Sequence, residues 1–358
     1  MTSLFDSVPL SRGPALINRF MLSPLTNHQS NADGTLSDGE HKWLEMRANG
    51  GFGLVMTCAS HVQKVGQGFP GQLGCFGDQH LSGLKRIADT IRAAGKVSYV
   101  QLHHAGNRSP KELIGEAPVC PSDDAETGAR ALTHAEVEQL IADFIAAAVR
   151  CDKAGFDGVE LHGAHGYLID NFFWEGTNQR DDQYGGSLVK RTRFATDIVQ
   201  SIRAEIGDDY PIILRFSQWK QQDFTARLAP SLEELEQFVK PLSDAGVDIF
   251  HCSTRRFWEP EFEGSDLNLA GWVKKITGKP TISVGSVGLT EEFIATYRGG
   301  EAEVASIDDL IARMEADEFD MIAVGRALIA NPDWVTKVRA GKFDELVTYN
   351  QEMLSQLI

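Results

Sequence analysis

His162, His165 and Tyr167 lie within six residues of one another near the middle of the chain. Each side chain carries a proton that can be donated to a developing oxyanion or transferred to a reacting atom. Gly163 and Gly166 separate them and allow the backbone to turn sharply, so that two imidazoles and a phenol can reach one small volume. The spacing therefore indicates a site that polarises a substrate and delivers a proton.

Two simpler interpretations of these residues stay open at this point. The pair His162 and His165 could be half of a metal site, but Zn²⁺ usually takes three or four close ligands, and no cysteine pair or third carboxylate-flanked histidine stands nearby. A histidine of this kind can also be a hydrogen-bonded core residue, with Tyr167, Leu168 and Ile169 packed beside it. We expect no metal ion here.

The element that positions this group is a short, mostly apolar run at residues 158–161, which follows the turn signal Gly155-Phe156-Asp157. It predicts a strand over 158–162 with His162 at its carboxyl end, where α/β folds place their chemistry. Strand-like and helical runs alternate in this way along the whole chain. The eight strand-like runs cover residues 20–25, 53–60, 97–103, 158–162, 211–216, 247–252, 280–284 and 320–324.

This alternation predicts a parallel sheet with helices outside it. A chain of 358 residues could form two average domains, but α/β barrels of this length are common as one domain. Because internal repeats and low-complexity linkers are missing, we expect a single (β/α)₈ TIM barrel over residues 1–358, with an N-terminal hairpin and long βα loops. Three predicted helices begin with a capping box, in which Ser37, Thr133 or Ser231 is followed three residues later by Glu.

The loops at the carboxyl ends of barrel strands build the active site in this fold. The predicted strand ends carry Thr26, His28, Gln101, His103 and Arg215. The last two strands end in Gly285-Ser286-Val287-Gly288 and Gly325-Arg326, the pair of loops in which many barrels hold a phosphate. An arginine there can make a two-pronged contact with phosphate. The alternative is that these glycines only permit tight turns.

Composition narrows the range of partners. The formal net charge of −16 and the pI near 5.1 argue against nucleic acid or an anionic membrane surface as a partner, so an anionic ligand would need a local basic site. The five cysteines are widely spaced without a Cys-x-x-Cys, which fits a reducing cytoplasm. No run approaches the roughly 18 apolar residues of a membrane helix, and the first residues do not read as a targeting signal.

The residues after Tyr167 extend the pattern with Asn171-Phe172-Phe173, Asn178-Gln179-Arg180-Asp181-Asp182 and Tyr184-Gly185-Gly186-Ser187. Together with the His-x-x-His pair and the tyrosine two residues on, this long ungapped run resembles the Old Yellow Enzyme family of FMN-dependent ene reductases. The resemblance covers nearly the whole chain. It implies the same barrel fold, a bound FMN, and NADPH or NADH as the reductant.

The resemblance also implies roles for single residues. Arg215 would lie beside N1 and O2 of the flavin, where the reduced ring carries negative charge that a guanidinium stabilises. Gln101 would pair with the pyrimidine part of the ring, and the two glycine loops would hold the phosphate. The full set of positions that correspond to flavin contacts is Pro24, Leu25, Thr26, Ala59, Gln101, His162, Arg215, Gly285, Ser286, Gly325 and Arg326.

On the substrate side, the resemblance implies that His162 and His165 hold the oxygen of an α,β-unsaturated carbonyl compound. Tyr167 would protonate the α-carbon once hydride has reached the β-carbon. His28 and His103 would line the substrate cavity, at positions where other members of the family carry Tyr, Trp or Ala. The shape of the substrate therefore does not follow from the resemblance.

Two other classes of function remain as alternatives. Related flavin barrels act as amine dehydrogenases, demethylases or dienoyl-CoA reductases, but they carry a clustered-Cys iron–sulfur site, which this sequence lacks. A barrel that only binds a small molecule is the second alternative. The loop Arg255-Arg256-Phe257-Trp258 either caps the site or contacts NADPH, or it is a surface loop held by its own salt bridges. The natural substrate, the preferred nicotinamide and the oligomeric state, a homo-oligomer included, stay open.

Overall fold

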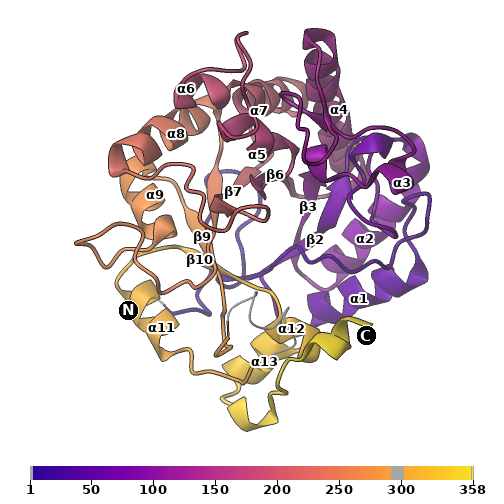
Figure 1. Cartoon of the computed structure of the whole chain (residues 1–358). Coiled ribbons are helices and arrows are strands. Elements are labelled where there is room, and N and C mark those ends of the chain that lie inside the picture. The colour runs from indigo at the N-terminus through magenta and orange to yellow at the C-terminus, as the bar shows by residue number, and fades with distance from the viewer. Residues whose placement is uncertain (1–2, 292–301, 356, 358) are drawn as a thin grey trace.

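Eight parallel strands form a closed barrel in the computed structural model, which describes residues 3–291, 302–355 and 357 (Figure 1). Their order around the barrel is β1, β10, β9, β8, β7, β6, β3 and β2, and β2 pairs with β1 to close it. The predicted (β/α)₈ barrel is therefore confirmed. The barrel strands are β1 (Phe20–Leu22), β2 (Leu54–His61), β3 (Val97–His103), β6 (Gly158–His165), β7 (Ile212–Lys220), β8 (Ile249–Ser253), β9 (Thr281–Val284) and β10 (Met321–Val324).

Helices surround the barrel as an outer ring, as Figure 1 shows. Their apolar faces cover the strands: in α4, for example, Val137, Leu140 and Phe144 are buried at helical spacing. The outer helices are α1 (Asp38–Asn49), α2 (Leu81–Ala93), α4 (His134–Ala154), α7 (Arg193–Ile206), α8 (Leu232–Ala245), α9 (Leu269–Thr277), α11 (Asp308–Glu315) and α13 (Trp334–Arg339).

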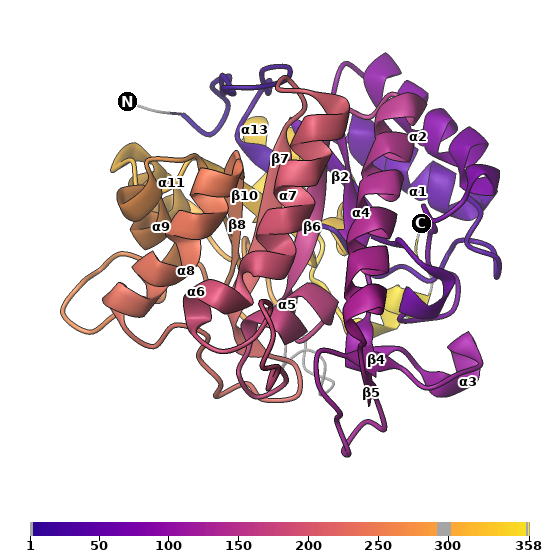
Figure 2. The same ribbon diagram turned by 90° about the horizontal axis from the view of Figure 1, so that it is seen from above.

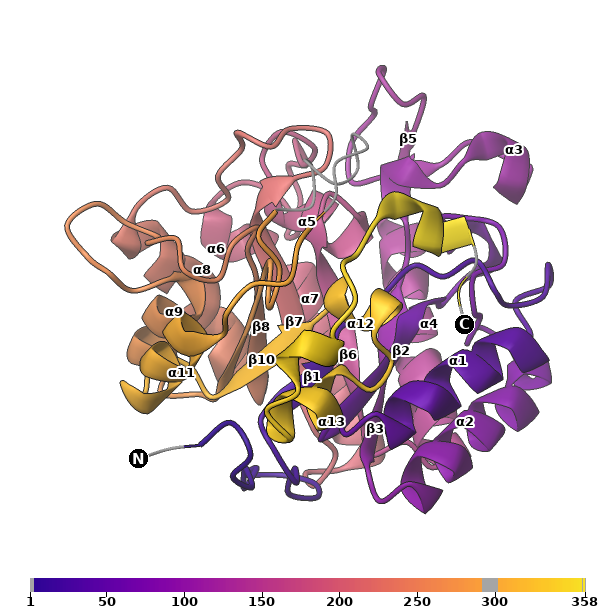
Figure 3. The same cartoon turned by 90° about the horizontal axis from the view of Figure 1, so that it is seen from below.

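Shorter elements lie in the connections between strands and helices. They are α3 (Lys111–Ile114), β4 (Val119–Cys120), β5 (Arg130–Ala131), α5 (Leu168–Phe173), α6 (Leu188–Arg191), α12 (Ala327–Ala330) and the 3₁₀ turns η1 (Lys64–Gly66), η2 (Asp78–His80), η3 (Gly106–Arg108), η4 (Phe343–Glu345) and η5 (Gln351–Ser355). In Figures 2 and 3 the segment with α3, β4 and β5 projects from the end of the barrel where α5 lies, opposite the N-terminal segment.

The N-terminal hairpin closes the amino-terminal end of the barrel. Val8 and Leu16 exchange two backbone hydrogen bonds of 2.9 Å and belong to the same apolar cluster as the barrel residues Met21, Leu54 and Met321. An interior that is filled with apolar side chains at this end leaves the carboxyl-terminal end for polar chemistry.

Two strands near the histidines are longer than the sequence analysis predicted. We expected His162 to end its strand, but β6 continues to His165, with an irregularity between Gly163 and His165. β7 likewise continues past Phe216 to Lys220, which pairs with His165. Both strands extend because the pairing resumes beyond the irregularity, and this brings the segment after Phe216 into the site.

The capping boxes are confirmed for two of the three predicted helices. Thr133 and Ser231 begin α4 and α8, with both reciprocal hydrogen bonds in place. At α1, Ser37 accepts a hydrogen bond from the backbone N–H of Glu40, but the Glu40 side chain does not return it. That carboxyl group is buried and instead binds Asn27, Ser30 and Cys58, so the predicted reciprocal box at Ser37 is wrong.

Candidate active site

Polar side chains line the carboxyl-terminal end of the barrel interior in a regular pattern. Alternate residues of a strand face the same side, and on four adjacent strands two successive inward positions are polar. The pairing of the strands places these polar residues side by side on neighbouring strands, since Gln101 is opposite Glu160, His162 is opposite Arg215, and Ser217 is opposite Ser253. The four pairs are Gln101 and His103, Glu160 and His162, Arg215 and Ser217, and His251 and Ser253.

The structure brings His162, His165 and Tyr167 together with His103. The ring of His162 lies 5.3 Å from His165 and 5.0 Å from Tyr167, measured between ring centroids. His103 contacts the same group, at 5.1 Å from His162 and 4.5 Å from Tyr167. The guanidinium of Arg108 lies 5.2 Å above the Tyr167 ring. The predicted clustering of two imidazoles and a phenol in one small volume is therefore present in the structure.

His165 is held from several directions. Its backbone is left-handed, with φ 64°, which is uncommon outside glycine. Its N–H donates to Ser217 Oγ at 2.9 Å, and its Nε2 lies 2.7 Å from Ser253 Oγ. The indole of Trp219 is stacked on the imidazole, 4.6 Å away and 22° from parallel. Sequence reasoning missed Ser253 and Trp219, although Trp219 continues the inward series that Arg215 and Ser217 begin.

Arg215 is a buried cation beside a second buried polar group. Its Nη2 donates to Ser253 Oγ at 3.3 Å, while its Nε has no hydrogen-bond partner in the described part of the chain. Nearby, Glu160 accepts a hydrogen bond from Gln101 at 2.6 Å and a second one from Nδ1 of His251 at 2.7 Å. Because Arg215 also lines the cavity, its unpartnered Nε is placed where a ligand could accept its hydrogen bond.

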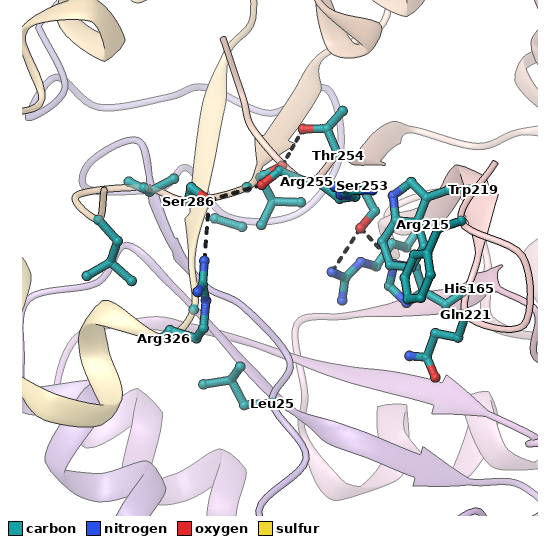
Figure 4. Close-up of a pocket in the computed structure, with 17 residues that line it drawn as sticks. Leu25, His165, Arg215, Trp219, Gln221, Ser253, Thr254, Arg255, Ser286 and Arg326 are labelled. Atoms are coloured by element: carbon teal, nitrogen blue, oxygen red, sulfur yellow. Dashed lines mark hydrogen bonds between the residues drawn. The ribbon is translucent and has the colours of Figure 1, made fainter. Parts of the chain in front are cut away.

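A cavity of about 190 Å³ opens beside His165 and Arg215. Figure 4 shows Trp219, Arg215 and His165 on one side of it, with Ser286 and Arg326 on the other. An Arg326 Nη2 donates to Ser286 Oγ at 3.3 Å, and that hydroxyl donates to the carbonyl of Arg255 at 3.1 Å. Seven of the residues predicted from the sequence line the cavity: Leu25, His165, Arg215, Gly285, Ser286, Gly325 and Arg326.

The remaining sequence-predicted residues lie outside the lining of this cavity. Gln101, His103 and His162 are buried in the barrel interior, and Tyr167 is partly buried above them. His28 is exposed, with its Nδ1 3.0 Å from the carbonyl oxygen of Pro70. The others, at partly buried or exposed positions on the ends of β1 and β2, are Pro24, Thr26 and Ala59.

The arginine-rich loop after β8, Arg255-Arg256-Phe257-Trp258, lies partly at the site and is partly held by a surface salt bridge. Arg255 lines the cavity, and its carbonyl accepts the hydrogen bond from Ser286. Arg256 instead forms a 2.8 Å ion pair with Glu259 on the surface. Phe257 is buried, and its backbone N–H donates to the carbonyl of Gly285 at 3.2 Å. The loop therefore supports the predicted phosphate loop through its backbone.

The histidines of the site are neutral at neutral pH. Burial, followed by the charge of Arg215, holds the pKa of His165 well below the ordinary 6.5. Burial and the neighbouring His165 do the same for the pKa of His162, and burial for the pKa of His103. Neutral imidazoles each carry one N–H donor. They can therefore donate a hydrogen bond to a ligand oxygen without carrying charge themselves.

Buried neutral histidines predict a loss of stability in acid. Burial, followed by the neighbouring His61, lowers the pKa of His104 to about 3. Its Nδ1 accepts the backbone N–H of Gly106 at 3.0 Å, and its Nε2 lies 3.2 Å from Oε1 of Gln63. In the unfolded chain the same group takes up a proton below about pH 6.5. The free energy of unfolding therefore does not depend on this group above pH 6.5. Below pH 6.5 it decreases, by up to about 1.4 kcal/mol for each pH unit, until the pH reaches about 3.

Urea unfolding as a function of pH checks this expectation. The difference in free energy of unfolding between the parent and His104→Asn should narrow as the pH falls from 7 to 4. The matched apolar control Ile87→Val in the core should lower the free energy by a similar amount at every pH, by about 0.5–1.5 kcal/mol. A constant difference for His104→Asn would contradict a neutral His104 in the folded state.

Neither a metal cluster nor a membrane helix is found in the residues that the structure describes. Within 3–291, 302–355 and 357, no group of three or more His, Cys, Asp or Glu side chains could hold a metal ion. No helix in that part of the chain is long and apolar enough to cross a bilayer. All five cysteines are buried as thiols outside disulfides.

A polar, partly cationic site at the carboxyl-terminal end of a (β/α)₈ barrel, with two adjacent glycine loops, is the arrangement of barrels that bind a phosphate-containing cofactor. Comparison with known proteins gives the family. Residues 3–345 match the NADH:flavin oxidoreductase / NADH oxidase family, and the chain belongs to this family, that of the Old Yellow Enzymes. It is an NAD(P)H-dependent flavin oxidoreductase with FMN as the cofactor.

Individual relatives agree with this assignment. The chain is 36% identical over 343 residues to an NADH oxidase of Thermoanaerobacter brockii, covering 92% of this chain and 50% of the relative, so it spans about half of that protein's length. It is 33% identical over 338 residues to an NADPH dehydrogenase of Listeria monocytogenes, covering 93% of each chain. The structure of an old yellow enzyme homologue from Zymomonas mobilis superposes with a TM-score of 0.82 at 26% identity, over 99% of this chain and 96% of the other.

Proposed function

We propose that this protein is an ene reductase that reduces the activated C=C bond of an α,β-unsaturated carbonyl compound. The observation that carries the proposal is the cluster of His162, His165 and Tyr167 beside the buried cation Arg215 and the cavity. A pair of neutral N–H donors suits a carbonyl oxygen that gains negative charge, and a phenol suits the proton that the reduced carbon then needs.

The residues present fit FMN. The unpartnered Nε of buried Arg215 offers a hydrogen bond and a positive charge to the flavin ring, and the guanidinium of Arg326, beside Ser286, offers a positive charge to the phosphate at the other side of the cavity. We assign Gly285 and Gly325 to the same phosphate site. Bound there, FMN reduced by NADPH or NADH would supply the hydride. The remaining flavin contacts that we propose are Pro24, Leu25, Thr26, Ala59, Gln101 and His162.

His162 and His165 would bind the substrate oxygen. The Nδ1 of His162 is buried and has no hydrogen-bond partner in the described part of the chain, so it is available to a ligand. Ser253 Oγ already accepts from Arg215, so its own proton can be donated to His165 Nε2. The Nδ1–H of His165 would then be the donor that faces the substrate. Two such donors stabilise an enolate oxygen more than the ground-state carbonyl, which lowers the barrier.

Tyr167 would deliver the proton to the α-carbon. Its ring contacts His103, His162 and the guanidinium of Arg108, and these contacts hold its orientation. We place His28 and His103 on the substrate side of the site. Trp219 and Phe224, whose rings are stacked 5.6 Å apart, form an aromatic wall of the cavity and would limit the width of the substrate.

Spectroscopy of the purified protein tests the proposal. We expect one FMN per chain, bound without a covalent link, whose visible absorbance is bleached by NADPH or NADH in the absence of oxygen. Addition of a cyclic enone should then restore the absorbance and yield the saturated ketone, while the corresponding saturated ketone added as a control should not. Flavin that is reduced by NAD(P)H but is reoxidised only by dioxygen or a quinone would contradict ene reduction and leave the flavin oxidoreductase class intact.

A further inference from the structure

A fully buried ion pair lies directly behind the turn that carries His165 and Tyr167. Lys220, the last residue of β7, donates from Nζ to Asp170 Oδ1 of α5 at 2.6 Å, and neither side chain has any exposed surface. Nζ also donates to the carbonyl of Ser217 at 3.3 Å. The proposed reaction uses neither residue, and charged side chains are buried completely only where they are paired, as these two are.

The pair is bonded to the backbone of the turn itself. The second carboxylate oxygen of Asp170 accepts the N–H of Gly166 at 2.7 Å, the residue between His165 and Tyr167. Beside Lys220, the N–H of Gln221 donates to the carbonyl of His165 at 3.3 Å. The ion pair and this backbone hydrogen bond together tie the peptide unit between His165 and Gly166 to the end of β7.

The turn needs such support because its backbone is strained. His165 and Gly166 are both left-handed, with φ of 64° and 80°, and the cost of this conformation at a non-glycine residue persists only where the surroundings enforce it. Moreover, burying two charges is unfavourable, and their attraction offsets this only with good geometry and further hydrogen bonds. Apolar residues of similar volume often replace a buried ion pair without loss of stability, so the specific contribution of this pair is its hydrogen bond to the Gly166 N–H.

We propose that Lys220 and Asp170 are positioning residues that hold the His165–Tyr167 turn so that both side chains reach the substrate. This inference rests on the proposed function of His165 and Tyr167. Asp170 acts through the N–H of Gly166, and Lys220 fixes the carboxylate and joins it to β7. Neither residue would touch the substrate or the flavin, so their loss should affect binding at the carbonyl site and leave binding of the flavin unchanged.

Two double variants of the FMN-loaded enzyme test this, both without a buried charge. In Lys220→Met/Asp170→Leu the Gly166 N–H loses its acceptor, and we expect the dissociation constant of a para-substituted phenol to rise about tenfold or more and enone turnover to fall by up to about 100-fold. In Lys220→Met/Asp170→Asn the amide oxygen can still accept, so the dissociation constant should rise only about threefold. Flavin content and flavin reduction by NADPH should stay at the parent values in both.

A matched control is available at the opposite end of β7. Asp248 is also buried, accepts the backbone N–H of Ile212 at 2.8 Å and pairs with Arg203 at 2.7 Å. The double variant Arg203→Met/Asp248→Leu should lower the melting temperature without weakening phenol binding. If it weakens phenol binding as much as the Lys220 and Asp170 variants do, the effect is one of general destabilisation, and the inference is wrong.

The remaining outcomes are also decisive. Parent-like phenol affinity in Lys220→Met/Asp170→Leu would overturn the positioning role. If that variant does not fold, Lys220→Met/Asp170→Asn provides the test. The inference then requires faster hydrogen exchange at the Gly166 N–H and phenol binding that is about threefold weaker than in the parent. Parent values for both quantities would overturn it. If His162→Ala/His165→Ala binds phenol as well as the parent, the proposed function itself fails, and the inference falls with it.

Discussion

Replacing Tyr167 by Phe should slow enone reduction by about 10²- to 10⁴-fold, the usual contribution of a positioned general acid. The same change should leave the reduction of the bound FMN by NADPH nearly unaltered, because that step takes no proton from the phenol. The enolate of the substrate, in contrast, must be protonated at the α-carbon before the saturated product can leave. The packing of the ring against His103 and His162 is retained in Phe.

Stopped-flow absorbance of the two half-reactions separates these effects. Acceptors that need no protonation at carbon, such as a quinone or dioxygen, should reoxidise the flavin of Tyr167→Phe at the parent rate. Tyr184→Phe is the matched control, since Tyr184 is buried against Phe172 in the same stretch of sequence, outside the cluster of His162 and Tyr167. Equal slowing of both half-reactions in Tyr167→Phe would mean that Tyr167 packs the site and that the proton comes from elsewhere.

The sequence predicts the fold of this chain well because the barrel repeats one local pattern. Each buried strand of a parallel barrel reads as a short apolar run between turn signals, and the eight predicted runs coincide with the eight barrel strands to within a few residues. Errors occur at the carboxyl ends of three strands: β1 already ends at Leu22, whereas β6 and β7 continue beyond their predicted ends. There the pairing resumes after an irregularity next to His165, which no periodic pattern reveals.

Part of the site could be predicted from the sequence, namely the residues that are close together in the chain. His162, His165 and Tyr167 are neighbours in the chain, so their spacing alone brings them together. Ser253 and Trp219 reach His165 from two other strands, and only the closure of the barrel sets those contacts. Period-two alternation carried from Arg215 through Ser217 would have found Trp219, and the same alternation from His251 would have found Ser253. The contact of each with His165 follows only from the pairing of the strands.

Local chemistry also competes with tertiary contacts at Glu40. The spacing from Ser37 predicts a capping box, and the serine half of it forms. The carboxyl group nevertheless turns inward, where Asn27 and the Cys58 thiol donate to it, and burial raises its pKa above the usual range. A motif of four residues indicates what a side chain can do at a helix start, whereas the neighbours that it meets after folding decide what it does.

The double variant His162→Ala/His165→Ala should lose most of its affinity for phenols. A phenolate oxygen resembles the enolate oxygen that the two imidazoles are proposed to stabilise, so phenols should bind the parent tightly and give a long-wavelength charge-transfer band with the flavin. A hydrogen bond to a charged group contributes about 1.5–3 kcal/mol, so each single variant should weaken binding by about 10- to 100-fold. Enone turnover should fall by about 10²- to 10³-fold per donor.

The pH dependence of phenol binding shows whether neutral imidazoles are the donors. Burial holds the pKa of His162 and of His165 well below 6.5, so neither side chain changes charge between pH 6 and 9. Affinity should therefore rise with pH through the ionisation of the phenol alone and then stay level. If the imidazoles instead had their ordinary pKa, a second step would be expected near pH 6.5, with tighter binding below it because an imidazolium attracts the phenolate. Titration of the charge-transfer band with an acidic para-substituted phenol distinguishes neutral imidazoles from imidazoles with an ordinary pKa. Parent-like phenol affinity in His162→Ala/His165→Ala would show that these two histidines are not the carbonyl site.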